Sequence, residues 1–178
     1  MKILLIGGTG KISMAISKQL LKEGHELYLI NRGRRNEELE NCSSHSPISL
    51  IGDIHNEQEM ESLLSGLHFD AVADFIAFHR FDLERDYRLF RGKTRQFLFI
   101  SSASAYQKPL ANYRITESTP LANPYWEYSR EKIECENYLM HLYRIEQFPV
   151  TIVRPSSTYD ERSIPAGIHG KKGSYSTI

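Results

Sequence analysis

The sequence predicts an α/β fold in which helices cover both faces of one parallel sheet. Short apolar stretches of strand length alternate with segments whose apolar residues recur at helical spacing. The first stretch leads directly into the glycine-rich turn Gly7-Gly8-Thr9-Gly10, and a helical pattern follows at once. Strands that alternate with helices are joined by right-handed crossovers, which makes the strands parallel. We therefore expect a doubly wound, three-layer α/β/α domain over residues 1–158.

The strands are expected where apolar runs end in turn residues. The first, at 2–6, ends at Gly7, and the second, at 25–30, ends at Asn31-Arg32-Gly33. The third, at 48–51, is closed by Gly52-Asp53-Ile54. Three later strands are expected at 70–77, 96–100 and 149–153. The run at 96–100 is almost continuously apolar, as in a strand buried on both faces.

The helices are expected between these strands. Met14, Ile16, Leu20 and Leu21 recur at roughly helical spacing, and Gly24 ends that helix. Further helices are expected at 57–64, at 83–90 and at about 124–146, and a short one at 36–39 within a charged stretch. Residues 159–178 contain glycines without clear periodicity, and we expect them to form a tail after the domain.

Composition and charge narrow the classes of partner. The 178 residues are 40% hydrophobic and 25% charged, which is ordinary for a globular domain. Lysine and arginine number 22, as do aspartate and glutamate, so no basic excess indicates a nucleic-acid partner. The longest apolar runs have strand length, and Met1-Lys2 leads directly into the first strand. We therefore expect a cytoplasmic protein with no membrane span and no cleaved signal peptide.

The two cysteines, Cys42 and Cys135, fall in different expected elements and lack metal-ligand spacing. Reduced cysteines and no metal site are the expectation.

The glycine-rich turn has the properties of a phosphate-binding loop. Gly7, Gly10 and Ser13 form the pattern G-x-x-G-x-x-S between a strand and a helix. Glycines permit a tight turn and a close approach to phosphate, and the start of a helix offers free N–H groups and a positive dipole end. The pattern is weak by itself, so its weight comes from the rest of the chain.

A second pattern carries acid–base chemistry. Tyr128 and Lys132 lie four residues apart in an expected helix, hence on one face. A phenol has an ordinary pKa of about 10, and a nearby ammonium favours its deprotonated form. The spacing alone is more often a solvated helix face. However, the segment follows Ser101-Ser102, which ends a strand at the ligand-binding edge of the sheet.

In these segments the chain resembles the extended short-chain dehydrogenase/reductase superfamily, the NAD-dependent epimerase/dehydratase group. The resemblance covers nearly the whole chain. The matching segments are the Gly7, Gly10 and Ser13 loop, the adenine-contacting Gly52-Asp53-Ile54, the fourth-strand contact Asp74-Phe75-Ile76-Ala77, the catalytic Ser102, Tyr128 and Lys132, and the R-P-x-x-x-Y segment Arg154 to Tyr159.

The resemblance implies a Rossmann fold that binds NAD or NADP and transfers hydride on a nucleotide sugar or similar hydroxylated metabolite, as an epimerase, dehydratase or reductase. Tyr128 would be the general acid/base, Ser102 would polarise the substrate oxygen, and Lys132 would bind the nicotinamide ribose and lower the tyrosine pKa. Superfamily dimers are common, so a homodimer is an expectation. The implied cofactor contacts are Gly7, Thr9, Gly10, Lys11, Ile12, Asn31, Arg32, Asp53, Ile54, Phe75, Ile76, Ala77, Ser101, Tyr128, Lys132, Pro155 and Ser156.

The chain departs from the family pattern in three ways. Ser13 replaces the third loop glycine and is small enough to preserve close helix–strand packing. Asn31 stands where an acidic residue usually holds the NAD ribose. Arg32 is either a partner for the 2′-phosphate of NADP or a solvated turn residue. Together the two residues weakly favour NADP over NAD. Family members continue for a further hundred residues or more, which form the substrate-binding lobe. The resemblance therefore implies that the tail at 159–178 leads to a lobe missing from this chain, which is either a fragment, the alternative we favour, or a short form with impaired chemistry.

Two other functions stay open. One is a dinucleotide-sensing regulatory protein that keeps the fold without the chemistry. The other is an RNA-binding relative of the same superfamily, as occurs in chloroplasts. The set of Ser102, Tyr128 and Lys132 favours the enzyme, and the neutral charge disfavours the RNA binder.

Three aromatic residues near the expected site are either substrate-lining or packing residues: Tyr106, Tyr125 and Trp126. Tyr125 is a rival for the catalytic phenol, but the residue four positions later is Ser129, so the spacing selects Tyr128.

Overall fold

The computed structural model describes residues 1–33, 37–40 and 45–159. Its strands are β1 (Lys2–Ile6), β2 (Glu26–Asn31), β3 (Ile48–Ile51), β4 (Ala71–Asp74), β5 (Phe97–Ile100) and β6 (Val150–Val153). Its α-helices are α1 (Lys11–Lys22), α2 (Glu37–Glu40), α3 (Glu57–Leu63), α4 (Arg80–Phe90) and α5 (Glu127–Glu146). The strands form one parallel sheet in the order β3-β2-β1-β4-β5-β6. This confirms the predicted doubly wound α/β fold.

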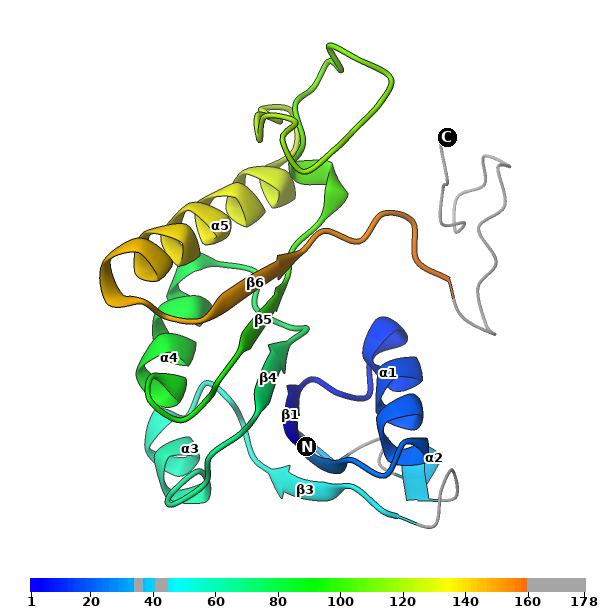
Figure 1. Ribbon diagram of the computed structural model, residues 1–178, viewed down its shortest axis with the longest axis vertical. Coiled ribbons are helices and arrows are strands. Elements are labelled where there is room, and N and C mark those ends of the chain that lie inside the picture. Colours follow the sequence, from blue (N-terminus) through cyan, green and yellow to red (C-terminus); the bar gives the residue numbers. More distant parts are fainter. Residues whose placement is uncertain (34–36, 41–44, 160–178) are drawn as a thin grey trace.

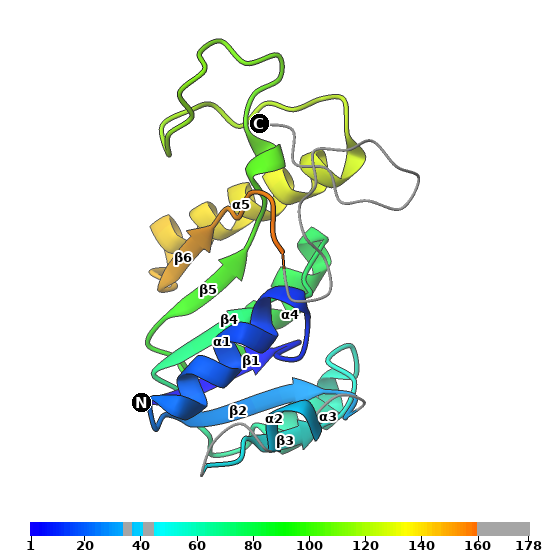
Figure 2. The same ribbon diagram turned by 90° about the vertical axis from the view of Figure 1, so that its right-hand side faces the viewer.

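Helices cover the sheet from both sides (Figures 1 and 2). On one face, α3, α4 and α5 pack on the sheet through a large apolar cluster that includes Met60, Phe90 and Leu139. On the other face, α1 and α2 cover the half of the sheet around β1 and β2 through Met14, Leu21 and Leu39. Both clusters contain residues of β1, which is the most deeply buried part of the sheet.

The strand order reverses at β1, and this reversal creates the place where a ligand site can form. Ile6, the last residue of β1, is aligned with Ile30 of β2 on one side and Asp74 of β4 on the other. The chain leaves these neighbouring strands in opposite directions, so their carboxyl ends border a crevice. Ligands bind at such a switch point in open α/β sheets.

Several predicted boundaries were wrong by a few residues, and capping side chains explain the largest errors. β4 ends at Asp74 instead of residue 77, because the Asp74 carboxylate accepts hydrogen bonds from the N–H groups of Ile76 and Ala77 and turns the chain. α4 begins at Arg80 instead of residue 83, because Asp82 accepts hydrogen bonds from the N–H groups of Phe78 and His79. α5 begins at Glu127 instead of about residue 124.

Some predicted features lie only partly within the residues that the structure describes. The short helix expected at 36–39 corresponds to α2, although residue 36 lies outside the described residues, as do Cys42 and the tail from residue 160. Cys135 is free and buried in α5. None of the described helices is long and apolar enough to cross a membrane.

Candidate active site

The turn after β1 has a shape that requires glycine. Gly7 has a φ of 77°, in the left-handed region that side chains disfavour. A Cβ atom at Gly7 would also lie only 2.5 Å from Cγ2 of Ile76, in the segment that follows β4. A Cβ atom at Gly8 would overlap the side chain of Leu29 in β2. The loop backbone therefore rests directly on the two neighbouring strands.

Ser13, in the first turn of α1, braces this loop. Its hydroxyl accepts a hydrogen bond from the N–H of Gly10 at 2.8 Å and donates one to the carbonyl of Gly7 at 2.6 Å. One turn later, the Ser17 hydroxyl donates to the carbonyl of Gly8 at 2.7 Å. Both serines are buried. The residue that replaces the family's third glycine thus makes two hydrogen bonds that a glycine cannot make.

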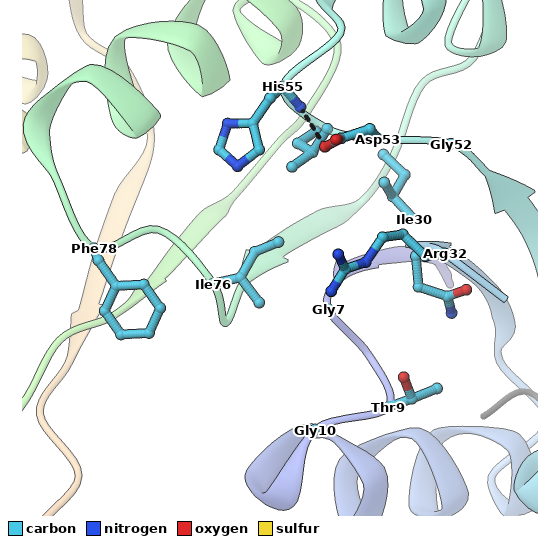
Figure 3. Close-up of a pocket in the computed structure, with 12 residues that line it drawn as sticks. Gly7, Thr9, Gly10, Ile30, Arg32, Gly52, Asp53, His55, Ile76 and Phe78 are labelled. Carbon is cyan, nitrogen blue, oxygen red and sulfur yellow. Dashed lines mark hydrogen bonds between the residues drawn. The ribbon is translucent and has the colours of Figure 1, made fainter. Parts of the chain in front are cut away.

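A cavity of about 540 Å³ opens in front of this loop, at the carboxyl ends of β1, β2 and β4. Its size is in the range of sites for small organic ligands. Asp53 and His55 lie across the cavity from Thr9 and Gly10 (Figure 3). The cavity is lined by Gly7, Thr9, Gly10, Ile30, Asn31, Arg32, Gly52, Asp53, Ile54, His55, Ile76 and Phe78.

The wall formed by Ile76 and Phe78 is held from behind by Asp74. One carboxylate oxygen of Asp74 accepts hydrogen bonds from the N–H groups of Ile76, at 2.5 Å, and Ala77, at 2.8 Å. Asp74 is fully buried. The turn after β4 therefore has a fixed backbone, and Ile76 is pressed against Gly7 of the glycine loop.

Ser102, Tyr128 and Lys132 come together beside the cavity. The Ser102 side chain lies close enough to the Tyr128 hydroxyl to lower the pKa of that phenol. The Nζ atom of Lys132 lies 5.7 Å from the centre of the Tyr128 ring. Phe78 links the two regions, because it lines the cavity and its ring centre lies 6.1 Å from that of Tyr128. The three residues predicted to be catalytic are thus one cluster.

Hydrogen bonds from Ser104 determine how the Ser102 hydroxyl can be used. Its Oγ atom accepts hydrogen bonds from the N–H of Ser104 at 3.1 Å and from the Ser104 hydroxyl at 2.9 Å. With both Ser104 groups donating, the Ser102 proton is left free to donate to another acceptor on the side of Tyr128. Burial raises the pKa of Tyr128 above its ordinary value, and the hydrogen bond from Ser102 lowers it in part.

Lys132 is buried and anchored by backbone carbonyls. Its Nζ atom donates hydrogen bonds to the carbonyl of Ala77 at 2.7 Å and to the carbonyl of Ile100 at 2.9 Å. Only 2% of the residue is exposed. Burial lowers the pKa of Lys132, while Cys135 and nearby carboxylates oppose that shift. The ammonium thus connects the ends of β4 and β5, and its predicted contact with a nicotinamide ribose stays a prediction.

A second buried network supports the end of β5. The Ser101 hydroxyl donates to Glu136 of α5 at 2.5 Å, and Arg154, just after β6, donates to both Glu136 oxygens. Arg154 also donates to the Tyr106 hydroxyl at 3.1 Å. The hydrogen bonds to Glu136 raise the pKa of Arg154, so its charge is fixed. This network ties α5, which carries the catalytic candidates, to the ends of two strands.

The sequence profile of the NAD dependent epimerase/dehydratase family matches residues 3–172. The chain belongs to this family.

Comparison with solved structures gives the same fold at low sequence identity. The UDP-glucose 4-epimerase from Bifidobacterium longum, solved with NAD⁺ and UDP, has a TM-score of 0.77 and 19% identity, covering 86% of this chain and 52% of its own. The dTDP-glucose 4,6-dehydratase from Bacillus anthracis, solved with NAD, has a TM-score of 0.72 and 20% identity, covering 86% and 54%. The chain therefore spans about half the length of these epimerases and dehydratases.

One curated relative is named for binding stem-loops and not for epimerase or dehydratase activity. The chloroplast stem-loop binding protein of 41 kDa b from Arabidopsis thaliana is 31% identical over 117 residues. That alignment covers 60% of this chain and 30% of the relative.

In this epimerase/dehydratase family member, the cavity brings together many of the predicted cofactor contacts. Those that line it are Gly7, Thr9, Gly10, Asn31, Arg32, Asp53, Ile54 and Ile76. Those that lie outside its lining are Lys11, Ile12, Phe75, Ala77, Ser101, Tyr128, Lys132, Pro155 and Ser156. Ser101 uses its hydroxyl for Glu136, whereas Ala77 and Lys132 lie just behind the wall at Ile76. All of these cofactor contacts stay predictions.

The sequence reasoning missed Ile30, His55 and Phe78 and left Gly52 out of the contact set, although all four line the cavity. Each is adjacent in sequence to a predicted contact or one residue from it, so extending each motif by one or two positions would have found them.

The three aromatic candidates differ in how deeply they are buried. Tyr106 is buried and accepts a hydrogen bond from Arg154, which is a packing role. Tyr125 and Trp126 are exposed, and the Trp126 ring centre lies 4.9 Å from that of Tyr128. Within the described residues, no three His, Cys, Asp or Glu side chains converge as metal ligands do.

Proposed function

We propose that this chain is the dinucleotide-binding and catalytic part of an NAD(P)-dependent epimerase, dehydratase or reductase. Its substrate would be a nucleotide sugar or a similar hydroxylated metabolite, as the names of the neighbouring enzymes suggest. The observation that carries the proposal is the cluster of Ser102, Tyr128 and Lys132 beside a glycine-loop cavity. A protein that only senses a dinucleotide has no use for a hydrogen-bonded phenol at this place.

The cavity fits a dinucleotide in its chemistry. Gly7 brings the loop backbone close to the ligand space, and the first turn of α1 opens on the same side, where its N–H groups favour phosphate. Across the cavity, Asp53 offers a carboxylate and Ile54 an apolar surface for a heterocyclic base. When bound, the dinucleotide would supply the hydride donor or acceptor.

The chain's own residues would handle the proton. Tyr128 would take the proton of a substrate hydroxyl as the carbon–hydrogen bond loses hydride, and would return a proton in the reverse direction. Burial opposes phenolate formation at Tyr128, so the hydrogen bond from Ser102 and the positive charge of Lys132 would be needed to stabilise it. Lys132 would keep its place through the carbonyls of Ala77 and Ile100.

The experiment is a comparison of Tyr128→Phe with Tyr125→Phe, a matched change at an exposed neighbouring phenol. Dissociation constants for NADH and NADPH are measured by fluorescence, and turnover is followed with UDP-glucose and dTDP-glucose. We expect Tyr128→Phe to keep the dissociation constants and to lower turnover by about 10²- to 10⁴-fold. We expect Tyr125→Phe to behave as wild type. A wild-type protein that binds neither dinucleotide, or a Tyr128→Phe variant with full turnover, would refute the proposal.

For the choice of cofactor, we propose NADP over NAD. The side-chain oxygen of Asn31 accepts a hydrogen bond from the N–H of Gly33 at 2.7 Å, so it is less available to a ribose hydroxyl. Arg32 is exposed at the cavity and has the charge and donors for a 2′-phosphate. Against this, the family description and the two neighbours above refer to NAD. An NADH dissociation constant equal to or lower than that of NADPH would overturn the preference.

A second candidate is RNA binding, which the Arabidopsis relative's name favours through 31% identity. The formal charge of zero gives this chain little general attraction for phosphate backbones. A mobility-shift assay with a stem-loop RNA, repeated at two salt concentrations, distinguishes the candidates. Binding that is tight, steeply salt-dependent and unaffected by NADPH would favour the RNA binder.

A further inference from the structure

His55 lies on the side of the cavity opposite the glycine loop, and no part of the proposed function uses it. Its imidazole projects into the cavity near Ile76 and Phe78 (Figure 3). Its backbone N–H donates to the Asp53 carboxylate at 3.1 Å, which fixes the start of the side chain. The ring is therefore both accessible to a ligand and attached to a rigid turn.

A buried arginine holds the ring from behind. The NH1 atom of Arg85 in α4 lies 3.1 Å from Nδ1 of His55. Arg85 is itself fixed by acidic groups: its guanidinium donates to Asp86 at 2.7 and 2.9 Å and to Asp82 at 3.2 Å, and it lies 3.5 Å from Asp74. The Arg85 side chain is 5% exposed, so its contacts with the acidic groups are shielded from water, whereas the His55 side chain in front of it is 61% exposed.

The contact with Arg85 decides which ring nitrogen carries the proton. A guanidinium can only donate hydrogen bonds, so Nδ1 of His55 must be the acceptor. The Asp82 carboxylate is the competing partner for Nδ1, but at 3.8 Å it lies outside hydrogen-bond distance. This contact matches the tautomer whose hydrogen lies on Nε2, the ring nitrogen away from Arg85.

We propose that His55 is a cofactor-binding residue whose Nε2–H donates a hydrogen bond to the adenosine diphosphate half of the bound dinucleotide, with Arg85 as the positioning residue that fixes this tautomer. The inference rests on the proposed function of the cavity. The assignment to this half follows from the neighbours of His55, which are Asp53 and Ile54 on its own turn and the phosphate-binding loop opposite. The same acidic cluster also holds the wall at Ile76 through Asp74, so both sides of the cavity share one support.

Two substitutions of His55 test the roles of its two ring nitrogens separately. In His55→Asn, the amide oxygen can replace Nδ1 as the acceptor for Arg85, but no donor reaches the position of Nε2. In His55→Gln, the longer side chain can place an N–H near the position of Nε2. His68→Asn is the control, because His68 is exposed beside Lys2 and Asp70 at the opposite edge of the sheet.

Binding of ADP, NADH and NADPH is measured by calorimetry for each purified variant. We expect His55→Asn to weaken binding of all three by about five- to tenfold, as the loss of one hydrogen bond predicts. We expect His55→Gln to recover most of that loss, and His68→Asn to leave binding unchanged. Thermal unfolding of the variants is measured in parallel, to show that the loss is not caused by unfolding.

The tautomer is measured independently in the ligand-free wild-type protein, from the imidazole ¹⁵N chemical shifts at pH 7.5. We expect the Nε2–H form. An imidazole protonated on Nδ1, or equal binding by wild type and His55→Asn, would overturn the inference while leaving the proposed function intact. Weakened NADH binding with unchanged ADP binding would also overturn it. Wild-type protein that bound none of the three ligands would refute the proposed function, and this inference with it.

Discussion

Replacing Ser13 tests whether the serine in the glycine loop is a brace or merely a tolerated variant. Its hydroxyl is 1% exposed and makes hydrogen bonds to Gly10 N–H and Gly7 carbonyl at 2.8 and 2.6 Å. In Ser13→Ala both bonds are lost, and the two backbone groups keep only their mutual contact at 3.3 Å.

The magnitude follows from the two lost bonds. Each contributes about 1 kcal/mol, and the better helix propensity of alanine offsets up to about 0.5 kcal/mol. We expect Ser13→Ala to lower the free energy of unfolding by about 1.5 kcal/mol, or Tm by about 3–6 °C for a chain of this length. Ser13→Gly restores the family's glycine, loses the same bonds and has a helix propensity about 1 kcal/mol worse than that of alanine, so its loss should exceed that of Ser13→Ala by about that amount.

Urea unfolding and thermal denaturation provide the assay, with Ser17→Ala as the matched control. Ser17 makes one buried hydrogen bond, to the carbonyl of Gly8, so its loss should be about 1 kcal/mol. The expected order of destabilisation is Ser13→Gly, then Ser13→Ala, then Ser17→Ala. If Ser13→Gly were as stable as wild type, the serine would be a neutral replacement and the bracing argument would be wrong.

Three further predictions concern buried groups. Burial and the neighbouring Asp74 raise the pKa of Asp86 well above its usual range, so its stabilising contribution is complete below its ordinary pKa and is lost as pH rises through the raised value. Asp86→Asn, which keeps an acceptor oxygen for Arg85, should therefore flatten the fall in unfolding free energy as pH rises above the ordinary pKa of an aspartate; parallel urea curves for both proteins at every pH would contradict this. Burial raises the pKa of Cys135 to about 12, so a thiol reagent should label its peptide, read by mass spectrometry, only after unfolding. Rapid labelling of the native protein would show that the thiol is accessible. Glu136→Gln leaves Arg154 without its buried counter-charge and should cost about 3 kcal/mol, a fall of about 6–12 °C in Tm. A fall below about 2 °C would mean that the pair contributes little.

The strand and helix pattern was predictable because it depends on the spacing of apolar residues, which the sequence displays directly. The errors lie where a polar side chain competes with the backbone pattern. Asp74 follows three apolar residues and is predicted as part of a longer strand, but its carboxylate accepts hydrogen bonds from the N–H groups of Ile76 and Ala77 and ends the strand. Asp82 extends α4 backward in a similar way. Such effects depend on side-chain geometry that spacing does not contain.

For the site, the motifs indicated residues that line the cavity, whereas contacts between residues far apart in sequence could not be found. Tyr128 and Lys132 share a helix face, so local geometry was enough to pair them. His55 depends on Arg85, which lies thirty residues later in sequence, and no local pattern connects the two. Ser13 was interpreted by its size, because the sequence does not show that its hydroxyl reaches back to Gly7.

The central place of β1 has a consequence for the order of events during synthesis. β2 can pair with one edge of β1 early, but the other edge waits for β4, which begins at Ala71. Until that residue has left the ribosome, β1 exposes unpaired backbone groups and apolar side chains, a combination that recruits foreign strands. Gly7 waits for the same segment, because Ile76 closes its open side. The glycine loop therefore lacks its packing partner in a nascent chain that stalls before this point.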